Sequence, residues 1–249
     1  FGRGVELADA QPGALSAKTV LRLRECRGRV RGLLGDFDGA IADLSRVRDD
    51  TRRMGDHILE RAALIGLGQM YRKTGRGEDA ALHLSQALVG ARAGGDARVI
   101  ADTLYHIGTV AWDEGDNAQC MAYHQEAVDI SRRLGLSDLV AVQAVHGLGE
   151  AALMDSQSQF ATQCFSESLD LAREIGDLGY EAENLQMIGW TGMGTVGMGD
   201  YLRAWESLSQ SLALSQRAHL DWHSVCTLSG LGMVEGCLGH YGDGLAHLQ

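Results

Sequence analysis

The chain has 249 residues, of which 22 are basic and 33 acidic, giving a formal net charge of −11. A nucleic-acid surface normally shows a basic excess, so this balance argues against nucleic-acid binding. The arginines near the N-terminal end are expected to form a solvated helix flank. The apolar runs are too short to cross a membrane, and no signal-peptide pattern opens the chain.

The cysteines and histidines do not form any metal-binding pattern. The five cysteines are scattered and odd in number, and none form a CxxC pair, which predicts free thiols in a reducing, cytoplasmic compartment. The nine histidines show no HExxH motif. We therefore expect no metal and no cofactor. Because the chain begins at Phe1 and stops within a repeat at Gln249, we also expect it to be a segment of a longer protein.

Six glycines recur in register along the chain, at intervals of 40, 40, 41, 43 and 40 residues: Gly28, Gly68, Gly108, Gly149, Gly192 and Gly232. Seven residues after each comes a second glycine, replaced once by Ser156. Such self-similarity indicates a repeat architecture. The repeat divides the single segment 1–249 into a truncated end at 1–13, full units at 17–56, 57–96, 97–136, 137–177 and 178–220, and an incomplete unit at 221–249.

Each unit is predicted to contain two helices joined by a short turn. After Gly75, for example, apolar residues fall at helical intervals on one face, at Ala80, Leu84, Ala87 and Ala91. Helix lengths of about 16 to 18 residues follow from the spacing, at about 1.5 Å per residue. No alternating stretch of strand type occurs.

A second turn signal closes each unit, as at Gly55, Gly95, Gly135 and Gly176. Glycine just past a helix end supplies a left-handed cap, and the Asp that often follows can cap the next helix. The fifth unit departs from this signal with His219-Leu220-Asp221, which predicts a weaker cap there.

The first glycine of each unit is predicted to lie inside a helix, where it costs about 1 kcal/mol relative to alanine. We expect close packing of the partner helix to offset this cost. A position on the second helix is small throughout, as a tight crossing requires: Ala40, Ala80, Cys120, Ala161, Ala204 and Gly244.

This pattern resembles the tetratricopeptide repeat (TPR). The register glycines match its eighth position, the turn glycines its fifteenth, and the small series its twentieth. The clearest unit reads LIGLGQMYRKTGRGEDAALHLSQAL. The period of about 40 instead of 34 residues and the missing proline resemble the long-helix subclass. The resemblance implies an all-α, right-handed α-α superhelix (a TPR-like solenoid).

The resemblance also implies a peptide-binding groove on the concave face, lined by five positions of the first helix of each unit. Carried over to this sequence, the candidates are Arg29, Gln69, Arg72, Lys73, Tyr105, Thr109, Trp112, His146, Glu150, Met193 and Met233. Aromatic anchors among polar groups suit a peptide ligand. The alternative for Trp112, Met193 and Met233 is that they pack between neighbouring units.

The segment 189–199 holds five glycines. It lacks the preceding strand and the following Lys-Ser/Thr of a phosphate-binding loop, so we interpret it as a kinked helix end that forms a hinge.

No nucleophile or paired-carboxylate motif is recognisable, so the chain is predicted not to be an enzyme. We expect a scaffold that binds a protein or peptide partner. The alternative is a sensor or regulatory segment of a multidomain bacterial transcriptional activator or nucleotide cyclase, which contacts other domains of its parent chain. Leu245 and Leu248 are expected to form an exposed apolar end face, which would favour a homodimer.

Overall fold

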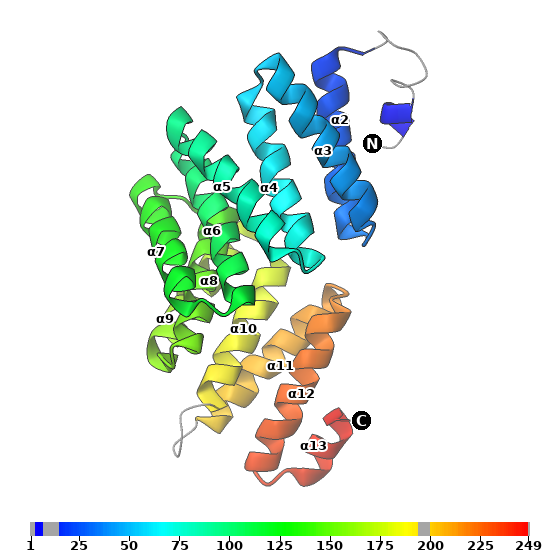
Figure 1. The fold of residues 1–249 in the computed structure, drawn as a ribbon. Coiled ribbons are helices and arrows are strands. Elements are labelled where there is room, and N and C mark those ends of the chain that lie inside the picture. Colours follow the sequence, from blue (N-terminus) through cyan, green and yellow to red (C-terminus); the bar gives the residue numbers. More distant parts are fainter. Residues whose placement is uncertain (1–2, 7–14, 194–199, 249) are drawn as a thin grey trace. The chain divides into compact units, whose positions relative to one another are not determined.

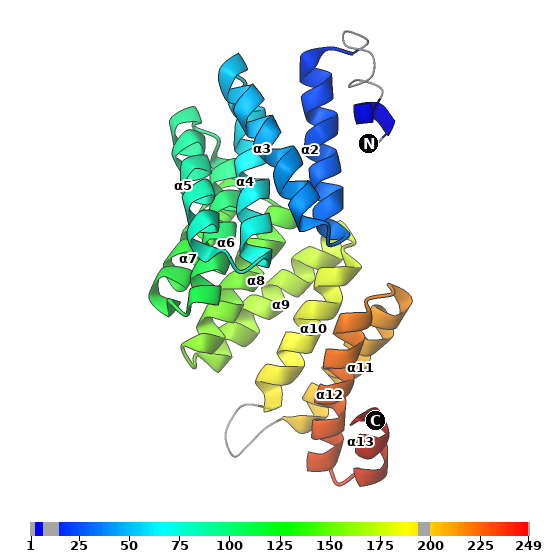
Figure 2. The same ribbon diagram turned by 45° about the vertical axis from the view of Figure 1, so that its right-hand side comes forward.

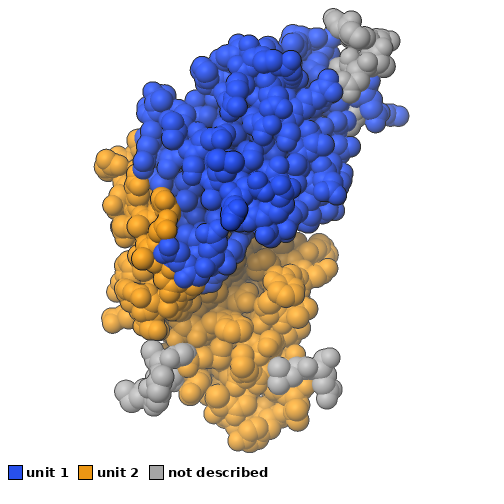
Figure 3. All heavy atoms as spheres, in the orientation of Figure 1, with its two compact units in different colours: residues 1–116 blue, residues 117–249 orange. Residues whose placement is uncertain are grey.

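The computed structural model describes residues 3–6, 15–193 and 200–248, and within these ranges every regular element is a helix. The chain forms two compact units, residues 1–116 and 117–249, which are coloured separately in Figure 3. The division between them falls inside the predicted repeat 97–136. Residues 1–2 and 7–13 of the predicted truncated end lie outside the described part.

Unit 1 contains a helical turn at residues 3–6 and five longer helices (Figure 1): α2 (Ala17–Leu33), α3 (Phe37–Met54), α4 (His57–Lys73), α5 (Gly77–Gly94) and α6 (Ala97–Glu114). Unit 2 contains seven: α7 (Asn117–Leu134), α8 (Leu139–Met154), α9 (Ser158–Ile175), α10 (Leu178–Met193), α11 (Tyr201–Arg217), α12 (Asp221–Cys237) and α13 (Tyr241–Leu248). Within each unit every helix packs against the next one along the chain. The predicted all-α repeat of helical hairpins is confirmed.

The turns follow the glycine pattern of the sequence. The predicted caps all have positive φ values: 71° at Gly55, 68° at Gly95, 61° at Gly135 and 72° at Gly176. His219 adopts the same left-handed conformation at φ 54°, and so does Ser156 at 60°. These two residues thus occupy positions whose geometry favours glycine, and both turns nevertheless adopt the left-handed conformation.

Aspartates begin most of the helices that follow. The side chain of Asp56 accepts a hydrogen bond from the backbone N–H of Leu59, and Asp96 accepts one from Val99. Each carboxylate satisfies one of the free N–H groups at a helix start and complements the helix dipole. The sequence predicted this arrangement.

The register glycines allow neighbouring helices to approach closely. A Cβ added to Gly68 would lie 2.5 Å from Leu84 Cγ, and one added to Gly149 would lie 2.7 Å from Phe165 Cε1. At Gly28 the corresponding distance to Leu44 Cγ is 3.0 Å. Each of these glycines therefore faces the large side chain of its partner helix, and the predicted close packing is observed.

The fifth repeat has a different register from the one expected. A Cβ on Gly189 would lie 2.6 Å from Leu208 Cγ, whereas one on Gly192 would meet Ala204 Cβ at an ordinary 3.4 Å. Gly189, and not Gly192, therefore makes the contact of the register glycines. It follows Gly149 by 40 residues, so the three extra residues of this repeat lie after it. Residues 194–199 of the predicted hinge lie outside the described part.

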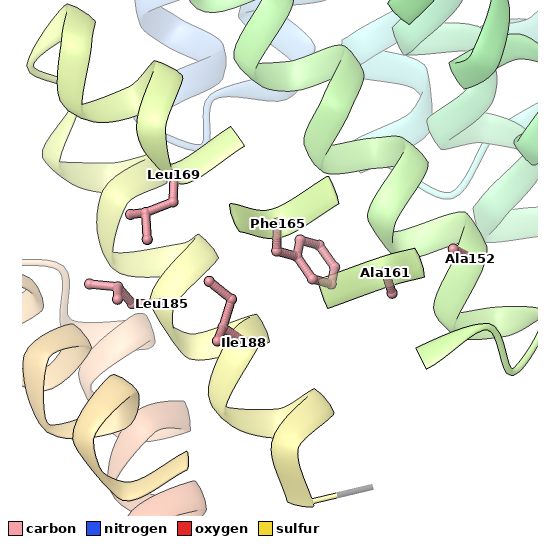
Figure 4. Packing of buried hydrophobic residues seen from close by; sticks show 6 residues of the cluster. All are labelled: Ala152, Ala161, Phe165, Leu169, Leu185 and Ile188. Carbon is pink, nitrogen blue, oxygen red and sulfur yellow. The ribbon is translucent and has the colours of Figure 1, made fainter. Parts of the chain in front are cut away.

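The core continues from one hairpin to the next. Figure 4 shows Phe165 of α9 beside Ala161, with Ala152 on α8 and Leu185 and Ile188 on α10. All of these side chains are buried. A hydrophobic face that one hairpin cannot bury alone is thus covered by its neighbour, as in other repeat proteins.

Candidate functional site

The first helices of neighbouring repeats contact one another directly. In unit 1, α4 packs against both α2 and α6, and in unit 2, α10 packs against α12. These helices and their equivalent α8 present the positions predicted to bind a partner. In each unit separately, we call this surface the A-helix face and define it by the predicted groove residues and the partners they contact across the repeats of that unit.

In unit 1 the A-helix face of α4 and α6 is held together by polar pairs. The amide nitrogen Nε2 of Gln69 lies 2.7 Å from Nε2 of His106, so the amide donates to the imidazole. Arg72 donates to Asp113 through a 2.9 Å contact, and both side chains remain about a third or more exposed, at 34% and 44%. Asp102 lies 3.7 Å from His106. Pairs from two repeats thus order a surface that solvent still reaches.

The other predicted residues of unit 1 differ in their solvent exposure. Tyr105 is half-buried, with its ring centroid 4.9 Å from that of His106. Trp112 is also half-buried, and Lys73 is exposed. Thr109 is buried and donates its hydroxyl to the carbonyl of His106 in its own helix. Tyr105 and Trp112 therefore offer ring surface, whereas the Thr109 hydroxyl is already used.

In unit 2 the A-helix face centres on His146, which is only 2% exposed. Its Nδ1 lies 3.0 Å from Oδ1 of Asn184 on α10. Its Nε2 lies 3.7 Å from a carboxylate oxygen of Glu150 and 3.8 Å from one of Glu183. One predicted residue, Glu150, and one residue that the prediction missed, Glu183, thus meet at the same imidazole.

The orientation of Asn184 determines which nitrogen of His146 donates. The amide nitrogen of Asn184 donates to Ser168 Oγ at 3.0 Å and to the carbonyl of Tyr180 at 2.7 Å. Its oxygen therefore faces His146, and Nδ1 must carry a proton to donate to it. Ser168 in turn donates to the carbonyl of Val142. A continuous buried network joins α8, α9 and α10.

The pKa values of two histidines in unit 2 are shifted in opposite directions. Burial lowers the pKa of His146, but the carboxylates of Glu150 and Glu183 and the hydrogen bond to Asn184 outweigh it and raise the pKa to about 9. Burial dominates at His124 and lowers its pKa to about 4. At neutral pH the site therefore holds one imidazolium between two carboxylates, beside a neutral imidazole.

Beyond this cluster the A-helix face of unit 2 becomes apolar. Trp190 on α10 is 40% exposed, and Met233 on α12 is 44% exposed. Trp190 packs beside Gly230, where an added Cβ would lie 3.2 Å from its Nε1. Met193, in contrast, is half-buried and packs on a core cluster that includes Leu208 on α11 and Leu231 on α12.

Residues of the A-helix face that were missed from the sequence include Asn184, Glu183, Trp190 and His106. Glu183 and Trp190 lie at groove positions once the fifth repeat is counted from Gly189 instead of Gly192. His106 lies next to a groove position, and its role depends on which way α6 is turned. The remaining candidate, Arg29, is exposed and lies 3.6 Å from Glu25 on its own helix.

Neither a metal site nor a membrane span is found among the described residues. No group of three or more His, Cys, Asp or Glu side chains within residues 3–6, 15–193 and 200–248 is arranged to hold a metal ion. Among the helices in the same ranges, none combines the length and the hydropathy that a membrane span requires.

The fold is similar to that of several solved structures. BtubC (BKLC) from P. vanneervenii matches with a TM-score of 0.74 and 18% identity, over 85% of this chain and 88% of that one. A STAND ATPase with a tetratricopeptide repeat sensor from Pyrococcus horikoshii matches with a TM-score of 0.77 and 12% identity, over 99% of this chain and 38% of that one.

A Rap conjugation regulator of plasmid pLS20, solved in complex with the Phr* peptide, matches with a TM-score of 0.75 and 16% identity, over 99% of this chain and 65% of that one. No protein-family model matches the chain, and no curated protein sequence matches it. The repeat geometry and these similarities together show that the chain has the tetratricopeptide-like helical-repeat fold.

Proposed function

We propose that the chain binds a peptide or helical segment of a partner protein along the A-helix face. The observation that carries this proposal is the pairing of polar side chains between neighbouring repeats, at Gln69 and His106, at Arg72 and Asp113, and around His146. Side chains already held in one geometry lose little conformational entropy on binding, which favours affinity.

The composition of the face also suits a peptide. Half-buried aromatic rings at Tyr105 and Trp112 lie among these polar groups in unit 1, and exposed Trp190 and Met233 follow the charged cluster in unit 2. Tryptophan and tyrosine are enriched among the hot-spot residues that contribute most of the binding energy at protein interfaces. The Rap regulator with its bound Phr* peptide has the same fold, which supports the same class of ligand here.

A regulatory role is the second candidate. The STAND ATPase carries its tetratricopeptide repeats as a sensor, and this chain spans 38% of that protein. In such an arrangement the A-helix face would bind a signal peptide or another domain of a longer parent chain. In either role we propose that the chain acts by binding and not by catalysis.

Display selection tests the proposal and requires no candidate partner. A random peptide library is selected on the immobilised full chain, and the enriched peptide is then mapped by hydrogen–deuterium exchange. We expect slower exchange in α4, α6, α8, α10 or α12 when the peptide is bound. Slowed exchange confined to the outer helices α3, α5, α9 or α11, or a library with no enriched peptide, would contradict the proposal.

A further inference from the structure

Unit 1 has a cavity of about 410 Å³ that the A-helix face does not use. It lies among the end of α3, the start of α4 and the second half of α5, whose places are seen in Figure 2. Gln69 and Arg72 lie in the opposite half of α4. The residues that line this cavity include Arg52, His57, Glu60, Arg61 and Gly90.

Arg61 is the unusual residue of this cavity. Its side chain is only 11% exposed, and its carboxylate contact, Asp96 Oδ2, lies at 4.0 Å. Within the part of the chain that the structure describes, the buried Nε of Arg61 has no hydrogen-bond partner. A buried guanidinium donor without an acceptor costs free energy, so a ligand that supplies an acceptor there would be stabilised.

The equivalent position in the other repeats is apolar. Counting seven residues back from each register glycine, with Gly189 for the fifth repeat, gives buried side chains at Leu21, Ala101, Val142 and Ala182 and the exposed Val225. Arg61 is therefore not needed to stack one hairpin on the next. The repeat architecture itself provides the comparison, because the same helix position is observed several times.

The facing helix is adapted to this arginine. A Cβ on Gly90 would lie 3.4 Å from both Cγ and Cδ of Arg61, so the stem of the arginine packs directly against this glycine. Gly90 lies six residues after Leu84, the large side chain that faces Gly68. The equivalent residues in other repeats are Asp50, Ile130, Leu171 and Leu214. Only the second repeat combines an arginine on one helix with a glycine opposite, and the cavity lies at that place.

The charges around the cavity leave Arg61 as the cation that lacks a close partner. Arg52 donates to Glu60 at 2.8 Å, and His57 lies 3.4 Å from the same carboxylate, so Glu60 is already paired. The other oxygen of Asp96 accepts from the backbone N–H of Val99, which holds this carboxylate at the start of α6.

We propose that this cavity binds a small anionic molecule through an oxyanion group, a carboxylate or a phosphate, that accepts hydrogen bonds from Arg61. Guanidinium groups bind both oxyanions with two parallel hydrogen bonds. The volume falls within the range of about 300–1,000 Å³ that is usual for small-molecule sites. The site would give the repeat segment an effector ligand distinct from its peptide.

Nuclear magnetic resonance of the Arg61 side chain tests this directly. The buried Nε–H should give a resolved signal, which Arg61→Leu assigns by removing it. Inorganic phosphate and acetate are titrated into the full chain, with sodium chloride at equal ionic strength as the control. We expect a saturable shift of this signal with at least one oxyanion, and which one acts distinguishes the two chemistries. Shifts no larger than those in chloride would overturn the proposal.

Thermal unfolding provides a second readout with a matched control. The active oxyanion should raise the melting temperature of the native chain above that in chloride, because a ligand that binds only the folded state stabilises it. Arg61→Leu, which installs the side chain of Leu21, should abolish this rise. Arg46→Leu removes an exposed arginine from α3 and should leave it unchanged. An equal rise in all three proteins would exclude Arg61 as the ligand-binding group.

Discussion

His146 and Asn184 lie 38 residues apart in the sequence, yet Nδ1 of one contacts Oδ1 of the other at 3.0 Å and ties α8 to α10. The contact joins neighbouring repeats through a side chain that is charged and almost fully buried. It therefore links the charge state of the A-helix face to the stability of unit 2.

That link predicts a loss of stability at alkaline pH. The folded-state pKa of His146 is raised to about 9 from 6.5, so its contribution is complete below about pH 6.5 and is lost as pH rises through about 9. Urea unfolding of the native chain should show this decline, and His146→Gln, which cannot titrate, should lack it. The same slope in both proteins would assign the decline to other groups.

The register glycines should tolerate even alanine poorly. Gly68→Ala would place a Cβ 2.5 Å from Leu84 Cγ, and such overpacking costs about 1–3 kcal/mol, which outweighs the gain of about 1 kcal/mol in helix propensity. We expect a lower free energy of unfolding. Gly236→Ala, with no atom within 4 Å of the new Cβ, serves as the control and should be neutral or stabilising. Equal effects at both sites would refute the close-approach explanation.

His219→Gly should stabilise the chain. His219 has a φ of 54°, a conformation that costs a residue with a side chain about 1–2 kcal/mol and glycine little. The melting temperature of the variant should rise. Ala218→Gly, at φ −90°, adds flexibility without relieving strain and should lower it. If both variants lower the melting temperature, the turn is not strained.

The buried carboxylate of Asp43 should be essential to the first hairpin. It accepts from Arg27 at 2.7 Å and from Arg31 at 2.8 Å, and it is 5% exposed. Asp43→Asn removes the charge but leaves the arginines, and breaking a buried pair costs about 3–5 kcal/mol. Asp38→Asn on the exposed side of α3 should cost at most about 1 kcal/mol. Similar losses from the two variants, measured by chemical unfolding, would contradict this role.

The sequence predicted the fold well because the signals that define it are local. Glycine turns and helical spacing of apolar residues can be recognised without knowing any long-range contact. The register of the fifth repeat was wrong because Gly189 and Gly192 both satisfy the local pattern, and only the contact with Leu208 distinguishes them.

The candidate site was harder to predict because it depends on pairs of helices. His146, Glu150, Gln69 and Arg72 were expected on the A-helix face, but their partners lie on the next repeat. Glu183 was missed as a consequence of the register. Arg61 could have been noticed by comparing each helix position across the repeats, since it alone is charged where the others are apolar.

The most direct test of the binding proposal compares the affinity of the selected peptide for matched variants. Gln69→Ala with Arg72→Ala changes the face of unit 1, Glu150→Gln with Glu183→Gln changes that of unit 2, and Arg46→Ala with Gln163→Ala changes exposed residues of the outer helices. Circular dichroism confirms that each variant keeps its helices. We predict that at least one of the first two pairs weakens binding tenfold or more, about 1.4 kcal/mol, while the third has no effect. Undiminished binding to both A-helix-face variants, or loss of binding only in the third, would contradict a partner site on the A-helix face.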